Sequence, residues 1–182
     1  GVAVLLLPVV QRVLAAIAHK EPDRVPIDQG SMRSTGIMAI AYNRLKAHLG
    51  IREGTTFVYD LVQQLAQPED WFLERFHVDA IDLGRATTGP AQWKPWTLPD
   101  GSPAMVPDWF QPERENGAWV IKDAEGTIIG RMPKDSLYID QAYWPLAGPD
   151  GLDNYEPLEE KMAQVIWAAL PSPPSDRPLT DE

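Results

Sequence analysis

The sequence predicts an α/β fold that opens with a helix, a short buried strand and a polar loop leading into a second helix. Apolar residues recur at helical spacing in the first helix, which Pro22 ends: Val13, Leu14, Ile17 and Ala18. Residues 25–27 are a compact apolar run that can serve as the first strand of a (β/α)8 barrel. Three polar residues follow directly, at the strand end where such barrels keep their active sites: Asp28, Ser31 and Arg33.

The composition is that of a globular chain and restricts its partners. The 182 residues suit one domain, with 44% apolar and 23% charged residues. The formal net charge of −10 disfavours nucleic acid and anionic membrane surfaces, since both would be repelled. The chain has no cysteine, which excludes disulfides and thiolate zinc sites within it and fits a reducing, cytoplasmic location. Its three histidines share no ligand-like spacing, so we expect no metal site in this chain.

Residues 1–10 are apolar but too short to span a bilayer. They lack the basic segment before the apolar run and the small-residue cleavage site that a signal peptide requires. We expect them to be an N-terminal arm packed on the domain, or a translated upstream stretch.

Further helices and one more barrel-type strand follow. A helix is expected at 35–49, with its apolar residues on one face and Gly50 as its stop. Residues 58–65 carry another helical pattern, and 68–76 form a helix with a proline and acidic residues at its start. Residues 78–83 are expected as a second strand, parallel and adjacent to residues 25–27 through a right-handed crossover.

The segment 90–143 is expected to be a β-rich excursion from this α/β frame, either covering an active site or decorating the fold. Residues 118–130 predict a hairpin that turns at 123–126, and 137–140 add a third strand. A last helix is expected at 157–170, followed by a proline-rich linker at 171–182. A complete (β/α)8 barrel needs about 250 residues. With only two recognisable barrel strands, we expect the chain to be the N-terminal half of a longer protein.

The order of motifs resembles the N-terminal part of the uroporphyrinogen decarboxylase family, which also contains cobalamin-dependent methyltransferases. The motifs are the first helix, an EPDRVP turn, a strand, an MRxxG loop and an FxVDA strand. The resemblance covers residues 11–85 well and residues 86–170 loosely. It implies the N-terminal part of a TIM barrel over residues 11–170, with a β-hairpin-rich insertion at 90–143.

The MRxxG loop matches the family only in part. Uroporphyrinogen decarboxylases carry Met-Arg-Gln-Ala-Gly-Arg here, and the two arginines bind substrate carboxylates. Met32, Arg33 and Gly36 match, but the second arginine is replaced by Ile37. Arginine suits the task because its planar fork pairs with a carboxylate through two hydrogen bonds. Arg33 is therefore a candidate substrate-binding residue, the alternative being a surface arginine near a helix start.

The FxVDA strand departs from the family at the catalytic position. An ungapped comparison places Ala86 where the decarboxylase has its catalytic Asp, and Asp82 matches only after realignment. Arg85, at the end of the same strand, is a candidate for binding an anionic ligand. Asp28, at the mouth of the expected barrel, either contacts ligand or caps a turn.

These departures favour the corrinoid-dependent methyltransferase-like branch over the decarboxylases. The resemblance implies, for the full-length parent, a zinc ion held by His and Cys ligands from the C-terminal half, and a small-molecule or corrinoid-protein substrate. The isolated chain is then expected to be inactive. Two alternatives remain: a genuine uroporphyrinogen decarboxylase of porphyrin biosynthesis, and a non-catalytic binding or assembly fragment. A half-barrel exposes strand edges and apolar faces, so a homo-oligomer is included among the expected partners.

Overall fold

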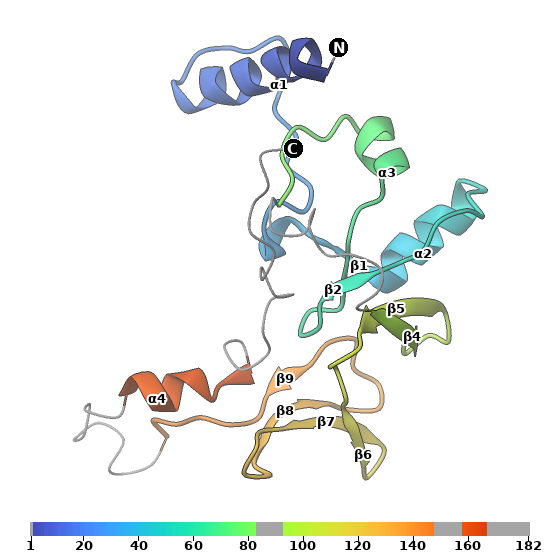
Figure 1. The fold of residues 1–182 in the computed structure, drawn as a ribbon, viewed down its shortest axis with the longest axis vertical. Coiled ribbons are helices and arrows are strands. Elements are labelled where there is room, and N and C mark those ends of the chain that lie inside the picture. Colours follow the sequence, from blue (N-terminus) through green and yellow to red (C-terminus); the bar gives the residue numbers. More distant parts are fainter. Residues whose placement is uncertain (1, 83–92, 148–157, 167–182) are drawn as a thin grey trace.

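The computed structural model describes residues 2–82, 93–147 and 158–166. Its elements run along an elongated molecule, with α1 at one end and the β6–β9 sheet and α4 at the other (Figure 1). In chain order they are α1 (Val2–Ile17), a 3-10 turn η1 (Arg33–Thr35), β1 (Ile37–Met38), α2 (Ala39–His48), β2 (Val58–Asp60), β3 (Leu65–Ala66), α3 (Asp70–Arg75), β4 (Trp93–Thr97), β5 (Pro103–Pro107), β6 (Glu113–Glu115), β7 (Ala118–Lys122), β8 (Ile128–Met132), β9 (Asp140–Gln141) and α4 (Leu158–Ala163).

The predicted barrel is wrong. The described residues form three small antiparallel sheets, in the orders β1-β3-β2, β4-β5 and β6-β7-β8-β9, and no barrel. Within the described chain, neither 25–27 nor 78–82 forms a strand, although the two runs do lie side by side in parallel at one bridge between Asp28 and Ala80. Pro26 has no N–H to donate, and the Ile27 N–H donates to the Asp79 side chain. A backbone ladder therefore cannot extend along this pair.

The predicted helix at 58–65 is also wrong, because these residues form the hairpin of β2 and β3. Asp60 Oδ1 accepts a hydrogen bond from the Gln63 N–H at 2.7 Å, and Gln64 adopts a positive φ of 55°. A carboxylate that caps its own turn competes with helix formation. The periodicity of this short apolar run is compatible with a helix or with a strand. The hydrogen bond that closes the turn at Asp60 favours the hairpin.

The predicted hairpin at 118–130 is confirmed by the antiparallel pair β7–β8. Its turn is closed by Asp123, whose Oδ1 accepts hydrogen bonds from the N–H groups of Glu125 at 3.1 Å and Thr127 at 2.7 Å. The predicted strand at 137–140 is the short β9, displaced to Asp140–Gln141. The helix predicted at 35–49 begins only at Ala39, after β1.

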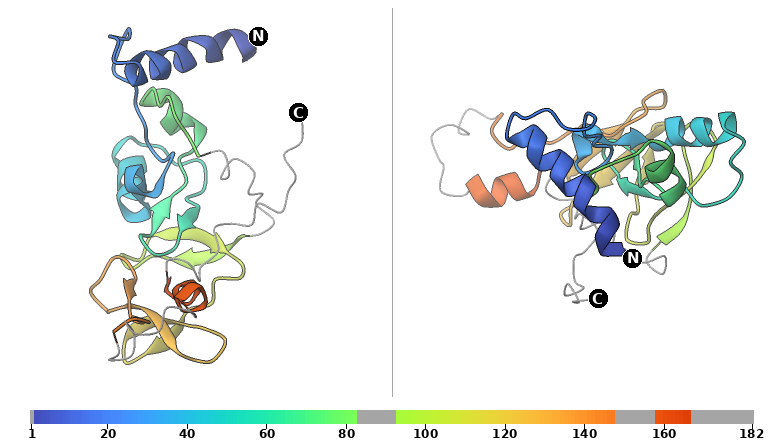
Figure 2. Two further views of the ribbon diagram at one scale, coloured as in Figure 1. Left: turned by 90° about the vertical axis from the view of Figure 1, so that its left-hand side faces the viewer. Right: turned by 90° about the horizontal axis from the view of Figure 1, so that it is seen from above.

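The buried core combines residues from the middle of the molecule with residues from the β6–β9 end. Two further views show these parts following one another along the long axis (Figure 2). The most deeply buried large side chains of the core come from α2, the three sheets, the residue before β9 and the segment after α4: Tyr42, Val58, Val106, Ile129, Ile139 and Ile166. By contrast, no side chain described in α1 belongs to this core. Arg12 holds this helix to the rest by pairing with Asp23 at 2.7 Å and with Asp79.

Candidate small-molecule site

A cavity of about 250 Å³ lies where the two parallel runs end. The Asp28–Ala80 bridge and the hydrogen bond from the Asp79 N–H to the Ile27 carbonyl, at 2.7 Å, bring the loop after residue 27 beside the residues after 80. The end of β3 and the start of α3 complete the cavity. Its lining residues are Gln29, Gly30, Gln67, Pro68, Asp70, Leu73, Ile81 and Asp82.

Asp82 is the one predicted site residue that lines this cavity. Its carboxylate is joined there by that of Asp70, from the first turn of α3. Among the described residues that line the cavity there is no Lys, Arg or His, and the two charged side chains are both carboxylates. Amide groups of Gln29 and Gln67 and apolar side chains of Leu73 and Ile81 make up most of the remaining wall. Such a cavity suits a small ligand that is neutral or positively charged.

Asp28 lies beside the cavity but is occupied within its own loop. Its carboxylate accepts hydrogen bonds from the Ser31 N–H at 3.0 Å, the Ser31 hydroxyl at 2.6 Å and the Thr35 hydroxyl at 3.1 Å. These bonds fold residues 28–35 into a compact loop. Of its two predicted alternatives, Asp28 therefore fits the turn-forming role.

Arg33 is paired with a buried carboxylate. Its Nε lies 2.7 Å from Asp60 Oδ2, and the Asp60 side chain is only 1% exposed. An unpaired carboxylate at this depth would be costly, so the guanidinium compensates a charge inside the fold. Ile37, which stands where the family has its second arginine, is half-buried in β1. Arg85, the other predicted cation, lies outside the described residues.

Glu69 fixes the entry of α3 beside the cavity. Its carboxylate accepts hydrogen bonds from Lys46 Nζ at 2.7 Å, the Thr55 N–H at 2.9 Å, the Tyr42 hydroxyl at 3.0 Å and Trp71 Nε1 at 3.0 Å. Burial, with the nearby Glu69 charge, raises the pKa of the Tyr42 hydroxyl above its ordinary value. Tyr42 therefore stays protonated and can donate this hydrogen bond. This network holds Pro68 and Asp70 in place.

The sequence did not identify Gln67, Asp70 and Leu73 as lining residues. Asp70 was interpreted as an acidic residue at the start of a helix. The helix dipole explains such a residue, so its position gave no reason to expect a ligand. Only the approach of α3 to the 28–35 loop, far away in sequence, gives these residues a common cavity.

The described residues contain no group of three or more His, Cys, Asp or Glu side chains that could hold a metal ion. The zinc implied by the family resemblance thus has no fitting ligand set in the part of the chain that the structure describes. In the same residues, no helix has the length and apolar character needed to cross a bilayer.

Comparison with known proteins gives no match: no protein-family model, no curated protein and no solved structure is significantly similar to this chain. The family resemblance therefore rests on the sequence motifs alone.

Proposed function

We propose that this chain supplies substrate-binding residues to an enzyme of the uroporphyrinogen decarboxylase family, in its corrinoid-dependent methyltransferase-like branch. The substrate would occupy the cavity beside Asp82 and be small and neutral or cationic. The observation that carries the proposal is the pair of carboxylates in this cavity, which has no cationic side chain among its described lining residues.

The same charge argues against the decarboxylase alternative. A substrate with many carboxylates needs several cations in its binding site. The negatively charged side chains of Asp70 and Asp82 would instead repel it. Arg33, the residue that matches the decarboxylase clamp, is already paired with Asp60. The volume of about 250 Å³ also lies below the range of roughly 300–1,000 Å³ that holds drug-sized ligands, which are smaller than a tetrapyrrole.

Within the proposal, each part of the lining has one task. The Asp70 and Asp82 carboxylates attract a cationic or polar head group, while Leu73 and Ile81 contact its alkyl groups. The zinc and the corrinoid that the branch uses would come from outside this chain. These residues bind and orient the substrate and do not perform the transfer.

Titration with tetramethylammonium, followed by NMR of the Leu73 and Ile81 methyl groups, tests the proposal. We expect saturable shifts of these two residues with tetramethylammonium, weaker ones with neutral tert-butanol and none with acetate. Asp82→Asn should weaken tetramethylammonium binding about five-fold, or about 1 kcal/mol. Asp108→Asn is the matched control, because it removes an exposed carboxylate outside the cavity. Acetate binding, or equal effects of the two variants, would refute the proposal.

One observation favours self-association as a second candidate function. Three apolar side chains of α1, spaced four and three residues apart on one helix face, are half-exposed or more: Val10 (50%), Leu14 (57%) and Ile17 (69%). Light scattering should show a concentration-dependent increase in mass that Leu14→Lys abolishes. If the mass stays that of a monomer up to a protein concentration of roughly 200 µM, the Kd of self-association lies above that value and this candidate is excluded.

A further inference from the structure

A second and larger cavity lies along α2. It is a cleft of about 920 Å³ between α2, the segment 50–56 and the β4–β5 hairpin, and it shares no lining residue with the cavity beside Asp82. Its volume falls within the range of roughly 300–1,000 Å³ found for ligand sites. Figure 1 shows α2 and the β4–β5 hairpin that flank it.

One wall of the cleft is polar and positively charged. The α2 residues Asn43, Lys46 and Ala47 share one helix face, and Arg52, Thr55 and Thr56 follow in the next segment. Glu69 compensates Lys46 at 2.7 Å, but exposed Arg52 has no ion pair or hydrogen bond among the residues the structure describes. The lining includes no acidic side chain. In a protein of net charge −10, Arg52 thus gives this wall a local positive charge.

The opposite wall is mainly apolar, with Thr97 and Ser102 as its polar residues. Its apolar residues come from β4 and β5: Pro95, Trp96, Pro103, Ala104 and Met105. The ring of Trp96 packs 5.5 Å from that of Phe110 and 5.0 Å from that of Trp119, between centroids. These contacts fix the plane of the indole, so this wall offers a rigid aromatic surface.

The two walls are tied together without any ligand. Asn43 Nδ2 donates to the Ser102 hydroxyl at 3.0 Å and to the Pro103 carbonyl at 2.9 Å, while its Oδ1 accepts from the Thr56 hydroxyl at 2.5 Å. The Met105 N–H donates to the Thr56 carbonyl at 2.8 Å. Because the walls of the cleft are already fixed, little conformational entropy is lost when it binds a ligand.

We propose that this cleft binds a planar organic anion, an aromatic ring that carries a carboxylate or phosphate group. The ring packs against Trp96 and its apolar neighbours, and the anionic group pairs with Arg52. Arginine fits either anion because its planar fork donates two parallel hydrogen bonds.

Isothermal titration calorimetry with four probes tests the proposal. We expect 1-naphthyl phosphate and 1-naphthoate to bind with a Kd below about 1 mM, and 1-naphthol and inorganic phosphate at least ten-fold more weakly. A five-fold preference for one naphthyl anion would identify the acidic group that the cleft accepts. Equal binding of 1-naphthol, or no binding of either naphthyl anion, would overturn the proposal.

Three variants locate the binding. Arg52→Gln should weaken both naphthyl anions at least five-fold, whereas Arg75→Gln, which removes an exposed arginine of α3 outside the cleft, should change them less than two-fold. Ala47→Phe places a large side chain at an exposed position in the lining and should abolish binding. Thermal melting shows whether each variant is folded. Full affinity in folded Arg52→Gln or Ala47→Phe would overturn the assignment to this cleft.

Discussion

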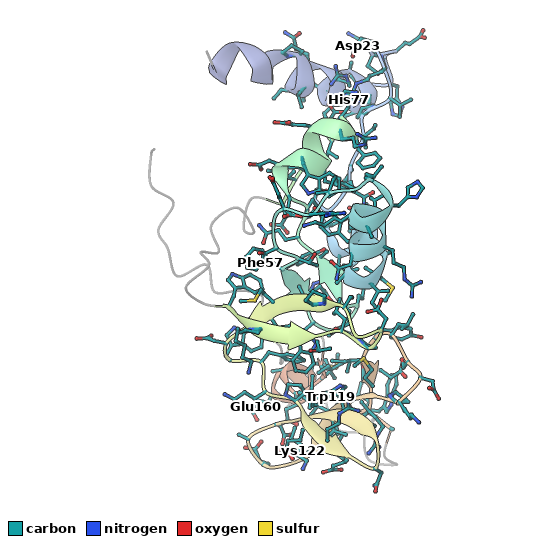
Figure 3. The ribbon with its side chains drawn as sticks, turned by 90° about the vertical axis from the view of Figure 1, so that its right-hand side faces the viewer. Asp23, Phe57, His77, Trp119, Lys122 and Glu160 are labelled. Carbon is teal, nitrogen blue, oxygen red and sulfur yellow. The ribbon has the colours of Figure 1, made fainter. Side chains whose placement is uncertain are left out.

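Asp79 and Ile27 are joined by two hydrogen bonds, of which only one uses both backbones. The Asp79 N–H donates to the Ile27 carbonyl at 2.7 Å, and the Ile27 N–H donates back to the Asp79 carboxylate at 2.9 Å. The same carboxylate accepts from Arg24 at 2.7 and 2.8 Å and pairs with Arg12 of α1. Figure 3 places Asp23 and His77, which flank this network, at the α1 end of the molecule. One buried side chain therefore holds three segments together.

Asp79→Asn should lower the free energy of unfolding by about 3 kcal/mol, because it leaves two guanidinium groups without their shared carboxylate. Urea denaturation followed by circular dichroism measures this loss. Asp23→Asn is the control, since Asp23 also pairs with Arg12 but its side chain is 65% exposed. A loss for Asp79→Asn no larger than that of the control would contradict the central role of Asp79.

Stability should depend on pH through the same carboxylate. Burial opposes ionisation of Asp79, but hydrogen bonds from the Ile27 N–H, Arg24 and Arg12 outweigh it and hold its pKa below the ordinary value. A lowered folded-state pKa means that the stabilisation is complete above the unfolded pKa of about 3.9. It is lost as the pH falls through the folded pKa. The hydrogen bond from Arg12 likewise lowers the pKa of Asp23 to about 2.

We therefore expect the stability difference between the parent chain and Asp79→Asn to be constant from pH 7 to 5 and to shrink below pH 4 or so. Urea denaturation at pH 7, 5, 4 and 3 measures it. The difference should be smaller at pH 3 than at pH 5, whereas a difference that is undiminished at pH 3 or that grows on acidification would contradict this prediction.

Arg33 and Asp60 should be strongly coupled. Arg33→Gln leaves the carboxylate of Asp60 buried without its cation and should cost about 3 kcal/mol of folding free energy. Adding Asp60→Asn should recover part of that loss, because it removes the unpaired charge. A double-mutant cycle from urea denaturation measures the coupling. A coupling near zero would show that Arg33 is available to a ligand.

Gly117→Ala should destabilise the β6–β7 hairpin by about 1 kcal/mol. Asn116 and Gly117 both have positive φ, at 49° and 82°, and a Cβ on Gly117 would meet no atom within 4 Å. The cost is therefore conformational and not steric. Hydrogen exchange of the β6–β7 amides measures it, with Gly130→Ala as the contrasting case, where the new Cβ would lie 2.8 Å from Ile139 and Ile166 atoms. A neutral Gly117→Ala would contradict this explanation.

Local turn chemistry accounts for most of what the sequence could predict. The 118–130 hairpin was predictable because Asp123 and Gly126 lie in the turn itself. The β6–β7 hairpin was missed, although Asn116-Gly117 is the dipeptide most typical of a tight hairpin turn.

What the sequence could not predict depends on distant contacts. Residues 25–27 and 78–83 were expected to be adjacent parallel strands, but in the described residues they share one bridge, and the Asp79 side chain takes the place of a backbone ladder. The pairing of Arg33 with Asp60 required the β2–β3 hairpin, where a helix was predicted. The cavity and the cleft each combine segments whose approach no local pattern encodes.

We expect the two isolated parallel bridges, Asp28–Ala80 and Phe57–Met105, to form late when the chain folds. The pairs β4–β5, β6–β7 and β7–β8 join consecutive strands, and hairpins of this kind form in about 1–10 µs. Each bridge instead closes a loop of about fifty residues, whose entropy must be lost before its contacts form. The Asp28–Ala80 bridge borders the cavity, and Phe57–Met105 borders the cleft. Both ligand sites should therefore form last during folding and open first in sub-global unfolding. A bound ligand would then slow hydrogen exchange of the backbone amides at the bridge beside it.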